Sequence, residues 1–326
     1  MAIHFPKSRD EWLTLRHKYV SSTEQAALHG LSPYMTAFEL HHSKAKDTYT
    51  DFEAGERAKW GLRQEEAVAR AMADDYGIKV RKLNAYVSKD GTGMGASFDY
   101  EIVGVKEGEP AEGRVLQEMY ENNGPGILEV KTVDWLQFQR QWPEVEGERE
   151  APAHIEIQVQ AQLHVIERKW AAIGVLVGGN EFKLLVRDYD ADVGKAFEAR
   201  TKQFWKDLKA GKVPPAVFPQ DADLIAHIYS YGDPSKVLDA QGNLEIEALC
   251  TEYMDAALLK KGAGDRQDAA KAKLLLLIGD ASRVLVDGAI TITAGTVAAA
   301  RIEAYDRKAY RSFKVTKKAS KNGAKE

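Results

Sequence analysis

Ile127-Leu128-Glu129-Val130-Lys131 is the stretch that decides the fold and the candidate chemistry of this chain. Apart from its two charged residues the run is apolar and β-branched, and it follows the turn-forming Gly124-Pro125-Gly126, so it predicts a buried strand. Alternate residues of a strand share a face, which places the Glu129 carboxylate beside the Lys131 ammonium. Buried charges of this kind need a compensating partner.

A metal ion held by Glu129 and by Asp99, which lies on a strand predicted for residues 96–103, would account for these charges. Carboxylates hold hard divalent cations, and a lysine beside an attacking water suits metal-assisted phosphodiester hydrolysis. The pattern leaves a second interpretation open, in which Glu129 and Lys131 form only a partly buried ion pair.

Helices and strands alternate along the chain, which predicts an α/β fold with a mixed central sheet flanked by helices. Ser8-Arg9-Asp10-Glu11 and Ser21-Ser22-Thr23-Glu24 fit capping boxes, and each predicts the start of a helix. The polar residues 104–124 predict a loop. Further helices are predicted at about 35–46, 52–76, 152–167 and 193–209, and further strands at 80–87, 171–177 and 182–186.

Gly211-Lys212-Val213-Pro214-Pro215 ends this unit, and the composition changes from about residue 221. We predict a first domain over residues 1–219 and a mainly helical C-terminal extension over residues 220–326. Within the extension the sequence predicts helices at 244–261 and 266–285 and short strands at 289–293 and 312–315.

The net charge of −4 is unevenly distributed, because residues 301–326 hold nine Lys/Arg against three Asp/Glu. Such a basic tail can hold a phosphate backbone, or it can be a solvated and frayed terminus. Hydrophobic content of 44% and charged content of 29% are ordinary for a soluble protein. We expect a cytoplasmic location without membrane attachment, since no apolar run reaches the roughly 20 residues of a membrane span and the first residues do not resemble a signal peptide. The single Cys250 excludes internal disulfides, cysteine-rich zinc sites and an all-cysteine iron–sulfur cluster.

Seven motifs follow one another along the chain: Trp12-x3-Arg16, Thr23-Glu24, Leu31-Ser32-Pro33-Tyr34, Trp60-Gly61 with Glu65, Asp99, Glu129-x-Lys131 and Gln158-Val159-Gln160. In this order they resemble the lambda exonuclease / YqaJ-type viral recombinase nucleases of the restriction-endonuclease-like (PD-(D/E)xK) superfamily. The resemblance covers about residues 8–210 and leaves the C-terminal third of the chain outside it.

The resemblance implies a restriction-endonuclease-like core with a catalytic magnesium site. In that case Asp99 and Glu129 are Mg²⁺ ligands together with the backbone carbonyl of Val130, and Mn²⁺ could replace Mg²⁺ at such an oxygen site. Lys131 positions or activates the water and offsets charge on the scissile phosphate. Glu65 is an additional carboxylate near a second metal ion or its waters.

The resemblance also implies residues around this site. Gln158 supports the catalytic residues, and Arg16 and Thr23 bind the 5′-phosphate of DNA. The family has a phosphate-binding arginine shortly after the Glu-x-Lys strand. An ungapped comparison places Gln137 there with Arg140 close by, so the assignment of that role to Arg140 stays open.

The activity implied by the resemblance is Mg²⁺-dependent 5′→3′ exonuclease action on the ends of linear double-stranded DNA. The resulting 3′ single-stranded overhangs would pass to a single-strand annealing protein during phage-type recombination. By the same resemblance we expect a homo-oligomer, a trimeric ring around DNA. Two alternatives stay open at this point: an endonuclease of the same superfamily and a non-catalytic module that binds DNA ends.

Overall fold

The computed structural model describes residues 1–45, 55–106, 113–285, 291–294 and 296. The chain divides into two compact units, Met1–Leu224 and Ile225–Glu326. Among the described residues, no helix combines the length and the apolar character that a membrane crossing requires.

The first unit is built on a five-stranded sheet with the order β11-β10-β7-β6-β3. Strands β7 and β10 pair in parallel, and the other neighbours pair antiparallel, so the predicted mixed sheet is confirmed. A second, four-stranded sheet has the order β1-β4-β5-β2. The strands of the first sheet are β3 (Ile78–Lys82), β6 (Tyr100–Val105), β7 (Gly126–Val133), β10 (Trp170–Val177) and β11 (Glu181–Asp188), and those of the second are β1 (Ala2–His4), β2 (Val20–Ser21), β4 (Tyr86–Lys89) and β5 (Met94–Ser97).

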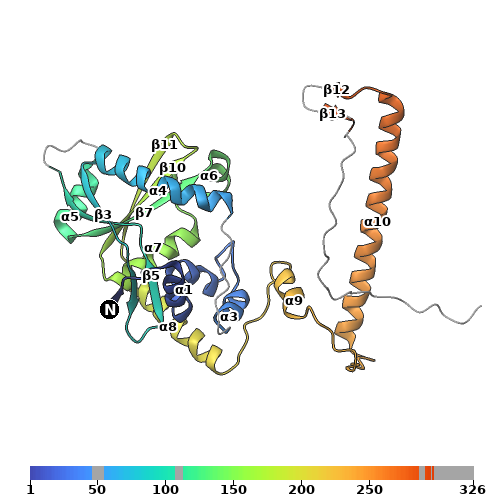
Figure 1. Ribbon diagram of the computed structural model, residues 1–326, viewed down its shortest axis with the longest axis horizontal. Helices are drawn as coiled ribbons and strands as arrows, with labels where there is room; N and C mark the ends of the chain where they lie inside the picture. Colours follow the sequence, from blue (N-terminus) through green and yellow to red (C-terminus); the bar gives the residue numbers. More distant parts are fainter. Residues whose placement is uncertain (46–54, 107–112, 286–290, 295, 297–326) are drawn as a thin grey trace, which may run out of the picture. The chain divides into compact units, whose positions relative to one another are not determined.

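Helices flank these sheets, which confirms the predicted α/β class (Figure 1). A short hairpin of β8 (Glu144–Val145) and β9 (Glu148–Arg149) follows α6. The helices of this unit are α1 (Arg9–Lys18), the 3₁₀ turn η1 (Ser22–Glu24), α2 (Gln25–Leu28), α3 (Ala37–Ala45), α4 (Glu56–Asp75), α5 (Arg114–Asn123), α6 (Trp135–Gln141), α7 (Ala153–Ile166) and α8 (Ala191–Lys209). Helix α9 (Ala222–Ile228) begins in the first unit and ends in the second.

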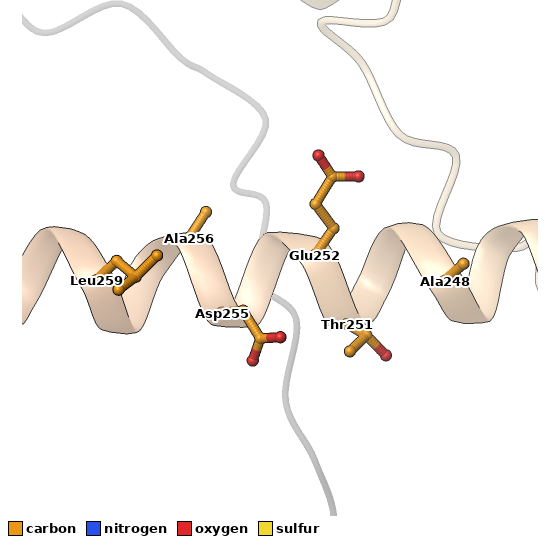
Figure 2. Close-up of a pocket in the computed structure, with 6 residues that line it drawn as sticks. All are labelled: Ala248, Thr251, Glu252, Asp255, Ala256 and Leu259. Carbon is orange, nitrogen blue, oxygen red and sulfur yellow. The ribbon is translucent and has the colours of Figure 1, made fainter.

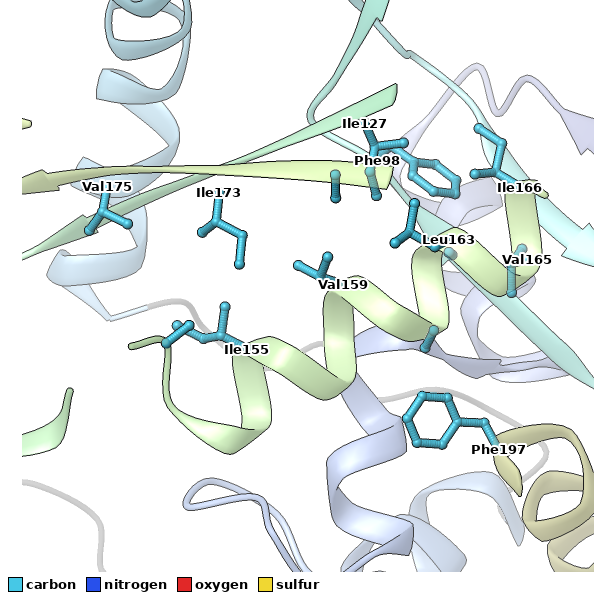
Figure 3. Packing of buried hydrophobic residues seen from close by; sticks show 14 of the residues in the cluster. Phe98, Ile127, Ile155, Val159, Leu163, Val165, Ile166, Ile173, Val175 and Phe197 are labelled. Carbon is cyan, nitrogen blue, oxygen red and sulfur yellow. The ribbon is translucent and has the colours of Figure 1, made fainter. Parts of the chain in front are cut away.

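Strand β7 is covered on both faces, which explains why its apolar residues form a continuous run. Leu128 and Val130 pack in the core cluster that includes residues of α4. Ile127 packs in the opposite cluster under α7, where Figure 3 shows Val159 directed toward Ile173 of β10. Each fully buried Leu, Ile or Val stabilises the fold by about 1.5–3 kcal/mol relative to exposure. Because alternate residues of a strand share a face, the side chains of Glu129 and Lys131 lie on the same side of β7 as Ile127, toward α7.

The predicted strands 80–87 and 96–103 are wrong as single strands, because each is divided between the two sheets. The first leaves the five-stranded sheet after Lys82 and enters the four-stranded sheet at Tyr86. The second passes in the reverse direction between Ser97 and Tyr100. The two crossings are joined by a hydrogen bond of 3.3 Å from the Leu83 amide to the Asp99 carbonyl. Asp99 therefore lies in a break between strands and not within one.

The predicted loop at residues 104–124 is also wrong, because it contains α5, whose Leu116 is fully buried. In the second unit, the two predicted helices form one helix, α10 (Leu244–Ile278), which continues through Gly262 and Gly264. A two-stranded sheet of β12 (Arg283–Leu285) and β13 (Thr291–Thr293) follows it. The basic tail and the strand predicted at 312–315 lie outside the described residues.

Helix α10 has no buried residue among those described. A shallow hollow lies along one side of it, and Figure 2 shows that the side chains around the hollow all project from this single helix. Within the described residues no second element contributes to this lining, so the hollow offers no converging groups for a ligand. The lining residues are Ala248, Thr251, Glu252, Asp255, Ala256 and Leu259.

We expect Gly126→Ala to destabilise the first unit. A methyl group at this position in β7 would lie 2.4 Å from the indole ring of Trp170, which is fully buried and cannot move aside freely. Overpacking of this kind costs about 1–3 kcal/mol. The measurement is the urea concentration at the unfolding midpoint.

The matched control is Gly61→Ala in α4, where the nearest atom to the added methyl is the Thr132 hydroxyl oxygen at 3.5 Å. Alanine in a helix interior stabilises by roughly 0.5–1 kcal/mol relative to glycine. Equal midpoints for Gly126→Ala and the wild type would contradict the close packing of β7 on Trp170.

Candidate active site

Glu129 lies in β7 with only 3% of its surface exposed, and its carboxylate accepts three hydrogen bonds. The Oε1 atom accepts from Gln158 Nε2 at 2.5 Å and from Lys131 Nζ at 2.5 Å. The Oε2 atom accepts from Gln162 Nε2 at 2.7 Å. These donors compensate the desolvation of the carboxylate and hold it in one orientation.

Gln158 and Gln162 lie one turn apart on α7, on the helix face that covers β7. Gln158 also accepts a hydrogen bond from Lys131 Nζ at 3.2 Å, and Gln162 also donates to the Ser97 carbonyl at 3.0 Å. Gln158 was predicted as a site residue, whereas Gln162 was not. The spacing of four residues from Gln158 within a predicted helix is the signal that could have identified it.

Asp99 approaches the same group from the break between β5 and β6. Strand β6 pairs with β7 as far as Leu128, opposite Tyr100, so the Val130 amide lies beyond the paired segment. Asp99 Oδ2 accepts the hydrogen bond of that amide at 2.8 Å. Burial and the negative charge of Glu129 together raise the pKa of Asp99 to about 8.

Lys131 is the positive member of the group, with 26% of its side chain exposed. Burial alone would lower the pKa of Lys131, but the negative charges of Glu129 and Asp99 outweigh this effect and raise it. The ammonium is therefore protonated at neutral pH. In that state Lys131 offers a positive charge and hydrogen-bond donors, not a base.

Asp99 and Glu129 fit a hard divalent cation, which takes carboxylate and carbonyl oxygens. A cation between them would relieve the repulsion that raises the pKa of Asp99. The carbonyl of Val130 fits as a further ligand, because the N–H and C=O of one strand residue point to the same edge and its N–H points to Asp99.

The predicted third carboxylate, Glu65, is not brought into this group. It lies on α4, and its carboxylate pairs with Lys82 Nζ at 3.1 Å. Among the residues that the structure describes, no three Asp, Glu, His or Cys side chains converge on one possible metal position. The role of Glu65 beside a second metal ion stays a prediction.

Arg16 and Thr23, the predicted 5′-phosphate residues, are brought together. Arg16 Nη2 donates to Thr23 Oγ1 at 3.3 Å and to Ser21 Oγ at 3.2 Å. The guanidinium also lies over the Trp12 ring, 4.9 Å from its centroid. The result is a guanidinium flanked by two hydroxyl groups at the start of a helical turn, an arrangement that suits an anion.

Glu24 and Lys44 form a buried ion pair that contacts Arg16 and holds it in place. Neither residue was among the predicted site residues. Glu24 is 5% exposed, and its Oε2 lies 2.8 Å from Lys44 Nζ while its Oε1 lies 3.6 Å from Arg16 Nη2. Lys44 also donates to the Arg16 and Tyr19 carbonyls at 2.7 Å and 2.9 Å. Burial opposes ionisation of Glu24, but the charges of Lys44 and Arg16 lower its pKa. Two cations and one carboxylate leave the cluster with a net positive charge.

Arg140 lies exposed in the last turn of α6, and Gln137 lies half-buried one turn before it. The assignment of a phosphate-binding role to either of them stays a prediction.

Comparison with known proteins identifies a domain within the first unit. Residues 11–169 match the model of the YqaJ-like viral recombinase domain. The protein YqaJ of Bacillus subtilis (strain 168) is 29% identical over 239 residues, which cover 71% of this chain and 67% of that protein. Residues 11–169 therefore carry a YqaJ-like viral recombinase domain, and the chain is homologous to YqaJ, which confirms the resemblance found in its motifs.

Two solved structures are similar to this chain. The alkaline exonuclease of Laribacter hongkongensis is 14% identical and covers 62% of this chain and 93% of its own, with a TM-score of 0.45. A phage-related exonuclease from Haemophilus somnus 129PT is 12% identical and covers 61% of this chain and 99% of its own, with a TM-score of 0.40.

We expect Asp99→Asn to change the pH dependence of folding stability in the metal-free protein. The pKa of Asp99 is about 8 in the folded state and about 3.9 in an unfolded chain, so between these values the folded state binds more protons. The Asp99 contribution to stability is therefore lost as the pH rises from about 4 to about 8. Asparagine does not titrate, so the variant should gain stability relative to the wild type across that window.

The measurement is the free energy of unfolding by urea in EDTA at several pH values. The control is Asp90→Asn, whose side chain is 72% exposed at the turn after β4. A constant difference between Asp99→Asn and the wild type from pH 4 to pH 8 would contradict the raised pKa.

Proposed function

We propose that this chain is a metal-dependent 5′→3′ exonuclease that acts on the ends of linear double-stranded DNA. The observation that carries the proposal is the convergence of Asp99, Glu129 and Lys131 around one edge of β7, with Glu129 oriented by two glutamines of α7. Its relatives support the nuclease class, because the family is described as viral recombinases and two similar structures are named exonucleases.

Asp99, Glu129 and the Val130 carbonyl would hold Mg²⁺, or Mn²⁺ in its place. A bound cation of this kind lowers the pKa of a coordinated water and stabilises charge on phosphate oxygens. Lys131, protonated between Glu129 and Gln158, would place its positive charge against the scissile phosphate. Gln158 and Gln162 keep the Glu129 carboxylate aimed in one direction, which preorganises the site.

Arg16, Ser21 and Thr23, together called the Arg16 cluster, support the proposed direction of digestion. Its guanidinium and its Ser21 and Thr23 hydroxyl groups suit a terminal phosphate, which carries more charge than an internal phosphodiester. Recognition of a 5′-phosphate would start hydrolysis at that end. The product would be a 3′-ended single strand, which we propose is passed to a single-strand annealing protein. We also propose a ring-shaped homo-oligomer, a trimer, around the DNA.

Digestion of defined DNA substrates tests this proposal. In Mg²⁺, a linear duplex with 5′-phosphates should shorten from its 5′ ends while a closed circle survives. Glu129→Ala should abolish digestion, because it removes a carboxylate that would hold the metal ion. Arg16→Ala should lower kcat/KM on the phosphorylated duplex by about 10- to 100-fold, since a charged hydrogen-bonding group contributes about 1.5–3 kcal/mol. On the duplex without phosphate it should change little.

The other outcomes support the two alternatives. If the closed circle is cut, the protein is an endonuclease. If DNA ends are bound but nothing is cut in Mg²⁺ or Mn²⁺, the protein is a module that binds DNA ends. Shortening from the 3′ ends would refute the assignment of Arg16 and Thr23 to a 5′-phosphate.

We expect Gln162→Ala to lower kcat on the phosphorylated duplex by about 10- to 100-fold, as is common when a group that orients a metal ligand is lost. The variant loses the hydrogen bond that fixes Glu129 Oε2 and the one to the Ser97 carbonyl. The matched control is Gln160→Ala in the same helix, whose amide instead bonds the Asp188 carbonyl at 2.7 Å. Equal kcat values for the two variants would show that Gln162 has no part in orienting Glu129.

A further inference from the structure

Among the described residues of the first unit, a groove is lined by four lysines and by no carboxylate. Its volume is about 630 Å³, and it lies between the C-terminal half of α8, the end of α1 and the turn that joins β4 to β5. None of the residues that the sequence analysis assigned to a site lies in it. The lining residues are Lys18, Gly91, Thr92, Gly93, Lys202, Trp205, Lys206 and Lys209.

The helix repeat brings three of these lysines to one side. Lys202, Lys206 and Lys209 are spaced by four and three residues on α8, so their side chains follow one face of the helix. The turn approaches this face closely, because Trp205 Nε1 donates to the Gly93 carbonyl at 3.1 Å. A side chain at Gly93 would collide with the indole, at 2.4 Å from its Cβ, and the positive φ of +75° also favours glycine there. The wall opposite α8 is therefore a fixed part of the fold.

Most of the positive charge in the groove is not neutralised. Lys202 pairs with Glu198 at 2.6 Å. Within the described part of the chain, Lys18, Lys206 and Lys209 have no carboxylate within ion-pair distance, and all three are exposed. Asp207, the nearest acidic neighbour of Lys206 in the sequence, forms its ion pair with Lys212 at 3.7 Å and interacts with Lys206 only over a longer distance.

The groove and the Arg16 cluster are built on neighbouring segments of the first unit. Lys18 follows Arg16 by two residues in α1, so the two side chains leave the helix on different sides. The Val20 amide donates to the Gly93 carbonyl at 2.9 Å, which ties the turn to the segment that carries Ser21 and Thr23. The end of α1 and this hydrogen bond therefore connect the groove to the Arg16 cluster.

We propose that this lysine groove binds the phosphate backbone of the DNA substrate next to its 5′-terminal phosphate. The inference rests on the proposed function, because it takes DNA as the substrate. Lysines contact phosphates as point charges, and such contacts do not distinguish one base from another, so binding in the groove is independent of the DNA sequence. The Trp205 indole donates a hydrogen bond to the Gly93 carbonyl and is only partly exposed. The groove therefore favours contact with the DNA backbone over stacking of a base on Trp205.

The test compares two triple variants of the full chain with the same change in net charge. K202Q/K206Q/K209Q removes the α8 lysines of the groove. K183Q/K195Q/K212Q removes three exposed lysines elsewhere on the same unit. Binding of a 5′-phosphorylated duplex oligonucleotide is measured in EDTA over a range of NaCl concentrations, so that no metal-dependent cleavage interferes.

The groove variant should bind at least about tenfold more weakly at 0.1 M salt, and its log–log salt slope should fall by about 2–3, near 0.9 for each lost phosphate contact. The control variant should keep a slope close to that of the wild type. Replacing the same three residues by arginine (K202R/K206R/K209R) should restore the wild-type slope, which shows that a loss of folding did not cause the effect.

Equal affinities and slopes for the groove and control variants would overturn the lysine groove alone, provided that the wild type binds and digests the duplex. If the wild type neither binds nor digests it, the proposed function fails and the groove inference fails with it. A slope that stays low in the arginine variant would also count against phosphate contact.

Discussion

The structure around the candidate site depends on one constraint, the burial of the Glu129 carboxylate in a strand that has helices on both faces. A carboxylate removed from water is costly unless hydrogen-bond donors replace the water. Here the donors are Lys131 and the amides of Gln158 and Gln162. Because both amides belong to α7, the requirement fixes which face of α7 meets β7.

A second constraint follows from where β6 stops pairing with β7. The chain passes from one sheet to the other between β5 and β6, so β6 does not extend along β7 as far as Val130. The Val130 amide therefore has no acceptor from β6 and donates to the Asp99 carboxylate. This crossing thus brings two carboxylates together, and their mutual repulsion raises the pKa of Asp99. Charge repulsion in a protein interior is tolerated at functional sites more often than in an ordinary core.

The sequence alone predicted the parts of this site that depend on local pattern. The strand at Glu129, the helix carrying Gln158 and the capping box of Ser21 and Glu24 follow from periodicity and side-chain hydrogen bonding, and the motif order supplied the pairing with Asp99. At the first predicted box Ser8 caps the helix, but Glu11 accepts from the Lys7 amide and not from that of Ser8. The division of residues 80–87 and 96–103 between two sheets was missed, because a change of strand partner leaves no period in the sequence. Helix α5 was missed since its polar face and its flanking glycines resemble a loop.

The buried pair of Glu24 and Lys44 shows why a motif can identify a residue and still conceal its support. Thr23-Glu24 was recognised as part of a capping box, and the Ser21 amide does donate to Glu24 at 2.8 Å. The same carboxylate also binds Lys44, some twenty residues later on α3, and this contact depends on how α3 packs against α1. Removing one member of a buried pair typically costs about 3–5 kcal/mol, because the other charge is left uncompensated. Arg16 is thus held by an interaction that is costly to break, and a fixed guanidinium loses little entropy when it binds an anion.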